Sequence, residues 1–164
     1  MTSPGALKVT ARGDRELVIT REFDAPRQLV FDAHTKPELI RRWLLGPEGW
    51  TMPVCDVDLR VGGSYRYVWR NAKGMEMGMG GVYREIFPPE RIVATEKFDE
   101  SWYPGGAVGT IVFTEQNGRT TLTQTMLYDS REARDAVLAS PMEEGLVQGY
   151  NRLGDLLASM PARS

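Results

Sequence analysis

Alternation of side chains with a period of two runs through the middle of this chain, and it constrains the fold more than any other feature. Across residues 50–128, short alternating segments are separated by turn residues, of which Asn117-Gly118 is the strongest hairpin signal. A β-branched segment at residues 17–23 adds a further strand. The pattern predicts an antiparallel sheet of six or seven strands.

Helical spacing of apolar side chains flanks these strands on both sides. It predicts a helix over residues 26–34 and a second helix that opens at Pro37. Asp129 and Glu132 have capping-box spacing before a short helix, and Pro141 opens the last one. The apolar stripe of that last helix consists of Met142, Leu146, Tyr150, Leu153, Leu157 and Met160. The fold class is therefore α+β, with a long amphipathic C-terminal helix.

Composition limits the classes of function. Twenty Lys and Arg residues stand against 22 Asp and Glu, and the net charge of −2 favours neither nucleic acid nor an anionic membrane surface. Apolar runs are too short for membrane insertion, and the first five residues lack a signal-peptide pattern, so we expect a cytoplasmic protein. We expect residues 1–14 to form a loose leader and residues 15–160 a single domain.

Five motifs in order resemble one known family. They are Phe23-Asp24-Ala25-Pro26 with Val30-Phe31, Thr35-Lys36-Pro37-Glu38-Leu39 with Arg42-Trp43, Asp58-Leu59-Arg60-Val61-Gly62-Gly63-Ser64-Tyr65, Gly81-Val82-Tyr83-Arg84-Glu85-Ile86 with Pro88-Pro89-Glu90-Arg91-Ile92, and Met142-Glu143-Glu144-Gly145. Together they resemble the Aha1-like (activator of Hsp90 ATPase homologue, C-terminal-domain-like) family of the START-like, or SRPBCC, superfamily. The resemblance covers roughly residues 15–158.

This resemblance implies a helix-grip fold, in which a curved antiparallel sheet grips the C-terminal helix and two short helices follow the first strand. A cavity lies between sheet and helix in such proteins. Across the superfamily it binds lipids, polyketides, hormones or aromatic compounds, and a minority of members catalyse cyclisation or related reactions. The co-chaperone that names the family has a separate N-terminal domain that binds the chaperone, and 164 residues leave no room for it.

Twelve residues are candidates for lining this cavity. Aromatic and methionine side chains alternate along two expected strands, and an aromatic pair in a Gly/Pro-rich loop is expected at the cavity mouth. The twelve are Trp43, Tyr65, Tyr67, Trp69, Met77, Met79, Glu96, Phe98, Trp102, Leu146, Gly149 and Tyr150. The same residues would also suit an ordinary apolar core.

Glu96 is the one acidic candidate. It shares the alternation of Ile92, Ala94 and Phe98, so an inward face would carry its carboxyl into an apolar pocket and raise its pKa. Such a group can orient a polar atom of a ligand or act as an acid. The alternative places Glu96 at the cavity mouth, near water.

Residues typical of catalysis and metal binding are scarce. We expect His34 at the end of a surface helix without a chemical role, and Cys55 as an inert buried thiol in a strand. Ligand spacing supports no metal, and the glycine run at residues 78–81 lacks the third glycine of a dinucleotide motif. No cofactor is therefore expected, and an enzyme is the less favoured reading.

The sequence thus favours non-covalent binding of a small apolar or aromatic ligand. Two alternatives stay open: a co-chaperone-like module that contacts a protein partner, and a cavity enzyme of cyclase or dehydratase type that uses Glu96 with tyrosine hydroxyls. A binder requires an internal pocket of about 300–1,000 Å³. An interaction module instead requires a filled core and an exposed apolar patch.

Gly149 lies near the centre of the C-terminal stripe, where the core should be thickest. Glycine costs a helix about 1 kcal/mol relative to alanine, so its presence needs a reason. Either the helix approaches the sheet so closely that an aromatic side chain of residues 65–69 fills the gap, or the gap is left for a ligand. We favour the second explanation.

Overall fold

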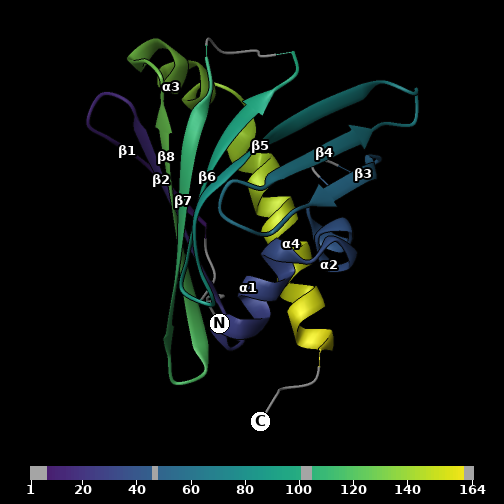
Figure 1. Ribbon diagram of the computed structural model, residues 1–164, viewed down its shortest axis with the longest axis vertical. Helices are drawn as coiled ribbons and strands as arrows, with labels where there is room; N and C mark the ends of the chain where they lie inside the picture. Colours follow the sequence, from purple (N-terminus) through teal and green to yellow (C-terminus); the bar gives the residue numbers. More distant parts are fainter. Residues whose placement is uncertain (1–6, 46–47, 101–104, 161–164) are drawn as a thin grey trace.

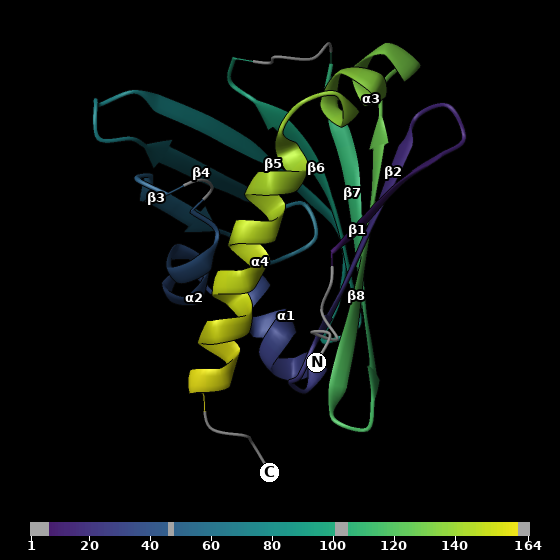
Figure 2. The ribbon, with the colours of Figure 1, turned by 180° about the vertical axis from the view of Figure 1, so that it is seen from behind.

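An antiparallel sheet curls around one long helix in the computed structural model, which describes residues 7–45, 48–100 and 105–160 (Figures 1 and 2). Within these residues the sheet has eight strands in the order β1-β2-β8-β7-β6-β5-β4-β3. The strands are β1 Lys8–Arg12, β2 Glu16–Phe23, β3 Thr51–Val57, β4 Ser64–Arg70, β5 Glu76–Phe87, β6 Arg91–Phe98, β7 Ala107–Gln116 and β8 Arg119–Tyr128. Every neighbouring pair is antiparallel.

The helices lie mainly inside the curve of this sheet. They are α1 Arg27–Thr35, α2 Pro37–Trp43, α3 Arg131–Leu138 and α4 Met142–Ser159. Figure 2 shows α4 running down the molecule in front of the sheet, with α1 and α2 beside its lower half. The predicted helix-grip α+β fold is therefore confirmed, but the expected six or seven strands are eight in the described residues. No helix in the described part of the chain is long and apolar enough to cross a membrane.

The filled part of the core lies where α1 and α4 meet β2, β7 and β8. Val30 of α1, Leu122 of β8 and Leu153 of α4 have no accessible surface. Phe31 of α1 meets Phe113 of β7 edge to face, with 5.7 Å between the ring centroids. Burial of such side chains is the main favourable term in folding, so this region anchors the helices on the sheet.

The predicted hairpin at Asn117-Gly118 is present. The two residues have φ angles of 55° and 77°, and they connect Gln116 to Arg119, which are paired across β7 and β8. Positive φ at both central positions is what a two-residue turn between twisted strands requires. This turn sets the register of the longest hairpin in the sheet.

The structure differs from the sequence prediction at β1 and at the N-terminus of α3. Residues 8–12, expected in a loose leader, form β1, which pairs with β2 from Lys8 opposite Thr20 to Arg12 opposite Glu16. The cap of α3 is Ser130, whose hydroxyl accepts a hydrogen bond from the Ala133 N–H, and not Asp129. β1 is an almost fully exposed edge strand, so it carries no amphipathic pattern that would reveal it.

Gly81, in the glycine run at residues 78–81, has a structural role. In β5 it stands opposite Tyr65 of β4, and a side chain there would place its Cβ only 1.8 Å from the Thr95 carbonyl oxygen of β6. The pairing of β5 with β6 also shifts register between Tyr83 and Glu85. Glycine therefore permits a close approach of two backbones where the sheet bends.

Gly81→Ala should lower the free energy of unfolding by about 2 kcal/mol or more, because the methyl group meets backbone that cannot move aside. Urea denaturation measures the loss. Gly145→Ala is the matched control, since nothing lies within 4 Å of that site on α4, and it should leave the protein as stable or slightly more stable. Equal stability of the two variants would contradict the close approach.

Candidate functional site

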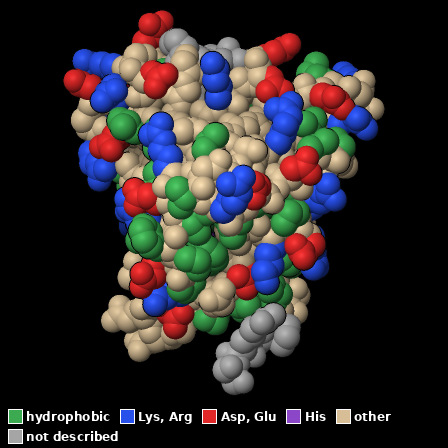
Figure 3. Space-filling view, in the orientation of Figure 1, with side chains coloured by type: hydrophobic (Ala, Val, Ile, Leu, Met, Phe, Trp, Pro, Cys, Tyr) green, Lys and Arg blue, Asp and Glu red, His purple; other side chains and the backbone are tan. Residues whose placement is uncertain are grey.

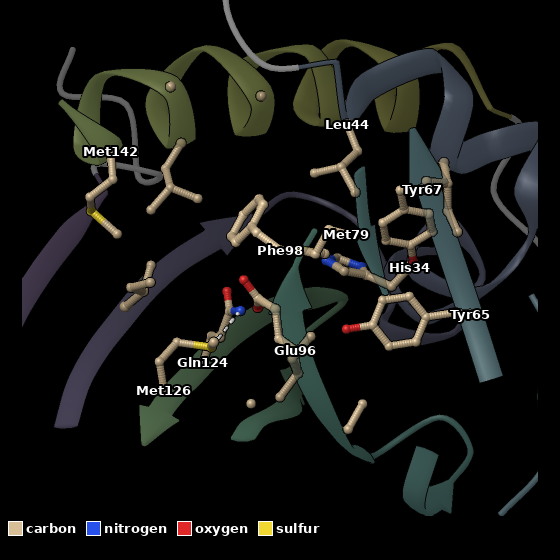
Figure 4. A pocket seen from close by; sticks show the side chains of 18 of the residues that line it. His34, Leu44, Tyr65, Tyr67, Met79, Glu96, Phe98, Gln124, Met126 and Met142 are labelled. Carbon is tan, nitrogen blue, oxygen red and sulfur yellow. Dashed lines mark hydrogen bonds between the residues drawn. The ribbon is translucent and has the colours of Figure 1, made fainter. Parts of the chain in front are cut away.

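A cavity of about 370 Å³ lies between α4 and the sheet. Figure 4 shows α4 passing above it and side chains of several strands entering it from below. Eleven of the twelve candidate residues line its wall: Trp43, Tyr65, Tyr67, Trp69, Met77, Met79, Glu96, Phe98, Leu146, Gly149 and Tyr150. Trp102 lies outside the described residues.

Small residues of both layers are part of the cavity wall. Ala94 of β6 and Gly109 of β7 are neighbours in the sheet, and both line the cavity. Gly145 and Gly149 of α4 line it from the helix side. Larger side chains hold the helix and the sheet apart, and small residues among them leave volume unfilled.

Aromatic rings form one wall of the cavity. Trp43 of α2 stacks on Tyr150 of α4 at 5.6 Å between centroids, and Tyr67 of β4 lies between Tyr65 at 5.0 Å and Trp69 at 5.9 Å. Such pairs stabilise each other beyond their buried area. They also hold a rigid apolar surface against the open volume.

The polar edges of the two indole rings are already bonded within the protein. Trp43 Nε1 donates to the Ala33 carbonyl oxygen at 2.8 Å, and Trp69 Nε1 donates to the Leu44 carbonyl oxygen at 2.7 Å. A buried N–H without a partner costs free energy, so these bonds fix the ring orientations. The indoles therefore offer a ligand their apolar surfaces.

Glu96 projects from β6 toward α4, next to Phe98 and Gln124 (Figure 4). It is enclosed by protein, and the side chain keeps some accessible surface because the cavity is wide enough to admit water. Loss of hydration is the cause that raises its pKa from 4.5 to about 7. In the described part of the chain no hydrogen bond or ion pair reaches its carboxyl.

The charge of Glu96 acts on two tyrosines across the cavity. It raises the pKa of Tyr67 from β4 and of Tyr150 from α4, in addition to the larger effect of their burial. The Tyr150 hydroxyl donates to Gln124 Oε1 at 3.2 Å, and the Tyr65 hydroxyl donates to the Thr95 carbonyl oxygen at 2.6 Å. Neither of these hydroxyls is directed at Glu96.

His34 was expected on the surface, and this prediction is wrong. Its ring is enclosed, lines the cavity, and meets Trp43 at 4.9 Å and Phe113 at 5.3 Å edge to face. Nδ1 lies 2.7 Å from the Val30 carbonyl oxygen and therefore carries the proton, which leaves Nε2 as a buried acceptor without a partner. Burial lowers the pKa of His34 to about 4, so the ring is neutral near pH 7.

Cys55 lies in β3 as a buried free thiol. Its burial is the main cause that raises its pKa to about 11, which keeps the sulfur protonated and unreactive near pH 7. Among the residues that the structure describes, no three His, Cys, Asp or Glu side chains gather as metal ligands would.

Gly149 is buried on the face of α4 that approaches α2. A Cβ there would have one neighbour within 4 Å, the Trp43 carbonyl oxygen at 3.8 Å, which is ordinary van der Waals contact. No ring of β4 fills the place of its missing side chain, contrary to the first of the two explanations considered above. The space beside Gly149 belongs instead to the cavity.

Gly149→Ala should raise the free energy of unfolding by about 0.5–1 kcal/mol, because alanine favours the helix and its methyl group fits without a clash. Urea denaturation monitored by circular dichroism measures this change. Gly154→Ala, on the same helix and in open space, should give a similar gain. A loss of stability confined to Gly149→Ala would mean that α2 and α4 are packed more tightly than described.

Glu96→Gln should change how stability depends on pH. Between pH 4.5 and about 7 the folded protein holds a proton on Glu96 that the unfolded chain releases, so the free energy of unfolding falls as pH rises. His34 acts in the opposite direction, because its pKa is lowered and the unfolded chain takes up the proton as pH falls. The difference between wild type and variant isolates Glu96.

From pH 5 to pH 8, the variant should gain about 2 kcal/mol in unfolding free energy relative to wild type. Denaturant titrations at both pH values measure this gain. Glu132→Gln removes an exposed carboxyl of α3 and should leave the wild-type profile unchanged. A carbon-detected NMR titration that gives Glu96 an ordinary pKa near 4.5 would refute the buried carboxyl.

Comparison with known proteins agrees with this architecture. The chain aligns with a protein from Rhodobacter sphaeroides at 30% identity and a TM-score of 0.89, covering 94% of this chain and 99% of that one. Proteins from Mycobacterium smegmatis and Staphylococcus epidermidis align at 25% and 27% identity, with TM-scores of 0.78 and 0.79; each alignment covers 94% of this chain, and 99% and 96% of theirs.

The family is shown by a match over most of the domain. No curated protein matches the sequence. Residues 24–158, however, match the family described as "Activator of Hsp90 ATPase homolog 1-like protein". This span begins directly after β2 and runs almost to the end of α4. It includes the described lining residues of the cavity except Ile19 of β2. The chain belongs to the Activator of Hsp90 ATPase homolog 1-like family, within the START-like, or SRPBCC, superfamily.

Proposed function

We propose that this protein binds a small apolar or aromatic molecule non-covalently in the cavity between α4 and the sheet. The observation that carries the proposal is the cavity itself, whose volume of about 370 Å³ falls in the range of small-molecule sites. Its wall is mostly aromatic and aliphatic, with few polar groups. Methionines such as Met77 and Met79 adapt to irregular ligand shapes.

The alternatives have weaker support. A protein-interaction module calls for a filled core, whereas this core contains a cavity of about 370 Å³. Figure 3 shows charged side chains of both signs spread over one face, with hydrophobic groups in small clusters between them. A cavity enzyme needs polar groups that converge on one atom, but the hydroxyls of Tyr65 and Tyr150 are bonded to Thr95 and Gln124.

The proposal includes a cytoplasmic location, as expected from the sequence. The free thiol of Cys55 suits a reducing compartment, since the chain uses no disulfide for stability. It also takes the ligand to be the main partner, in preference to a protein.

Gly149→Leu tests the binding site directly. The wild type should bind N-phenyl-1-naphthylamine, a neutral fluorescent probe, with a rise in probe fluorescence. Leucine at position 149 extends into the cavity, so the variant should lose affinity by about tenfold or more while keeping its fold. Gly154→Leu, on the same helix but away from the cavity, should bind like wild type.

Two results would overturn the proposed function. One is absence of probe binding by the wild type, together with absence of any copurified small molecule in native mass spectrometry. The other is an equal affinity of the two leucine variants, because the probe would then bind outside the cavity.

A further inference from the structure

Among the described residues of the cavity wall, the Glu96 carboxyl is an acceptor without a partner, while four donors of the wall are already bonded within the protein. The N–H and O–H groups of Trp43, Trp69, Tyr65 and Tyr150 all donate to protein oxygens at 2.6–3.2 Å. The carboxyl of Glu96, in contrast, receives no hydrogen bond within the described part of the chain. A ligand that satisfies this wall must therefore donate hydrogen bonds to it.

The charged side chains of the cavity wall also favour a ligand that donates hydrogen bonds and carries a positive charge. Its described lining contains no Lys or Arg, and Glu96 is the one side chain in it that is acidic. The Arg21 guanidinium lies near Tyr150, outside the cavity lining. An ionised carboxyl in apolar surroundings is costly unless a counter-charge accompanies it.

We propose that the cavity selects apolar, ring-bearing amines, which enter as ammonium ions and place the charged nitrogen at the Glu96 carboxylate. This inference rests on the proposed function and specifies its ligand class. The nitrogen supplies donors to the carboxylate, and the ion pair formed in the apolar cavity compensates the charge of Glu96. The rings of Trp43, Tyr65 and Tyr67 offer aromatic surface that attracts both the apolar part and the cation.

The same features disfavour other ligand classes. A fatty acid or an aromatic acid would bring a second negative charge into a wall without a cationic side chain. A neutral alcohol can donate one hydrogen bond to Glu96 but brings no counter-charge, and a hydrocarbon brings neither. Selectivity for an amine over its isosteric alcohol and acid is therefore the measurable consequence.

Few other groups in the cavity titrate near neutral pH. The titratable lining residues besides Glu96 are His34 and five tyrosines, from β4, β5, β8 and α4. Burial lowers the pKa of His34 to about 4 and raises that of Tyr83 to about 12, and burial also raises the pKa values of Tyr67 and Tyr150. Between pH 5.5 and pH 8, a change in amine affinity therefore reports on Glu96.

Isothermal titration calorimetry with three matched naphthalene compounds tests the inference. They are 1-naphthylmethylamine, 1-naphthylmethanol and 1-naphthoate, which differ chiefly in charge. At pH 8 the wild type should bind the amine about tenfold more tightly than the alcohol, and the alcohol more tightly than the acid. At pH 5.5 the amine, still protonated, should bind about tenfold more weakly because Glu96 then carries a proton.

Glu96→Gln should bring the amine and the alcohol to within about threefold of each other and abolish the pH dependence, while alcohol binding persists. Persistent alcohol binding shows that the variant is folded and the cavity open. Glu132→Gln is the matched control, because it removes one exposed carboxyl far from the lining and should keep the amine preference.

The outcomes separate the inference from the proposed function. Equal affinities for amine and alcohol, or tightest binding of the acid, would overturn amine selectivity while binding in the cavity stands. Retention of the amine preference in Glu96→Gln would also overturn it. If neither the naphthalene compounds nor N-phenyl-1-naphthylamine bind the wild type, both proposals fail.

Discussion

The packing of α4 across the curved sheet is the contact on which the rest of this structure depends. Leu153 is fully buried in it, and Tyr150 and Leu157 are buried on either side. At one end, α1 and its contact with β7 fill the space beneath the helix. At the other end the helix presents Gly145 and Gly149, so the same packing that forms the core also encloses a void.

Glu96 introduces a second constraint, because a carboxyl in an apolar cavity works against folding. Loss of hydration disfavours the charged form of Glu96 in the folded protein and thereby raises its pKa to about 7. Domains are stable by only about 5–15 kcal/mol, so an unpaired buried acid is a considerable cost. Such costs are typical of functional sites, where a residue serves a ligand at the expense of the fold.

The neutral state of His34 complements this arrangement. Its Nδ1 proton is held by the Val30 carbonyl oxygen, and its surroundings of Trp43 and Phe113 prevent it from becoming a cation. No positive charge of the described lining therefore competes with a ligand for Glu96. Apolar volume, aromatic rings and one acidic group together make up the described cavity wall.

Local sequence patterns determined most of the fold and the candidates for the cavity wall. Alternation placed Tyr65, Tyr67 and Trp69 on one face of β4, and Asn117-Gly118 set the β7–β8 hairpin, because strand period and turn geometry depend on neighbours in sequence. Tertiary structure decided the remainder. β1 is a strand because β2 offers it an edge. His34 is enclosed because Phe113 of β7, distant in sequence, packs against its ring together with Trp43 of α2. The cavity is likewise lined by residues of several elements, among them small residues of β6, β7 and α4, and a space that forms between separate elements leaves no pattern in any one of them.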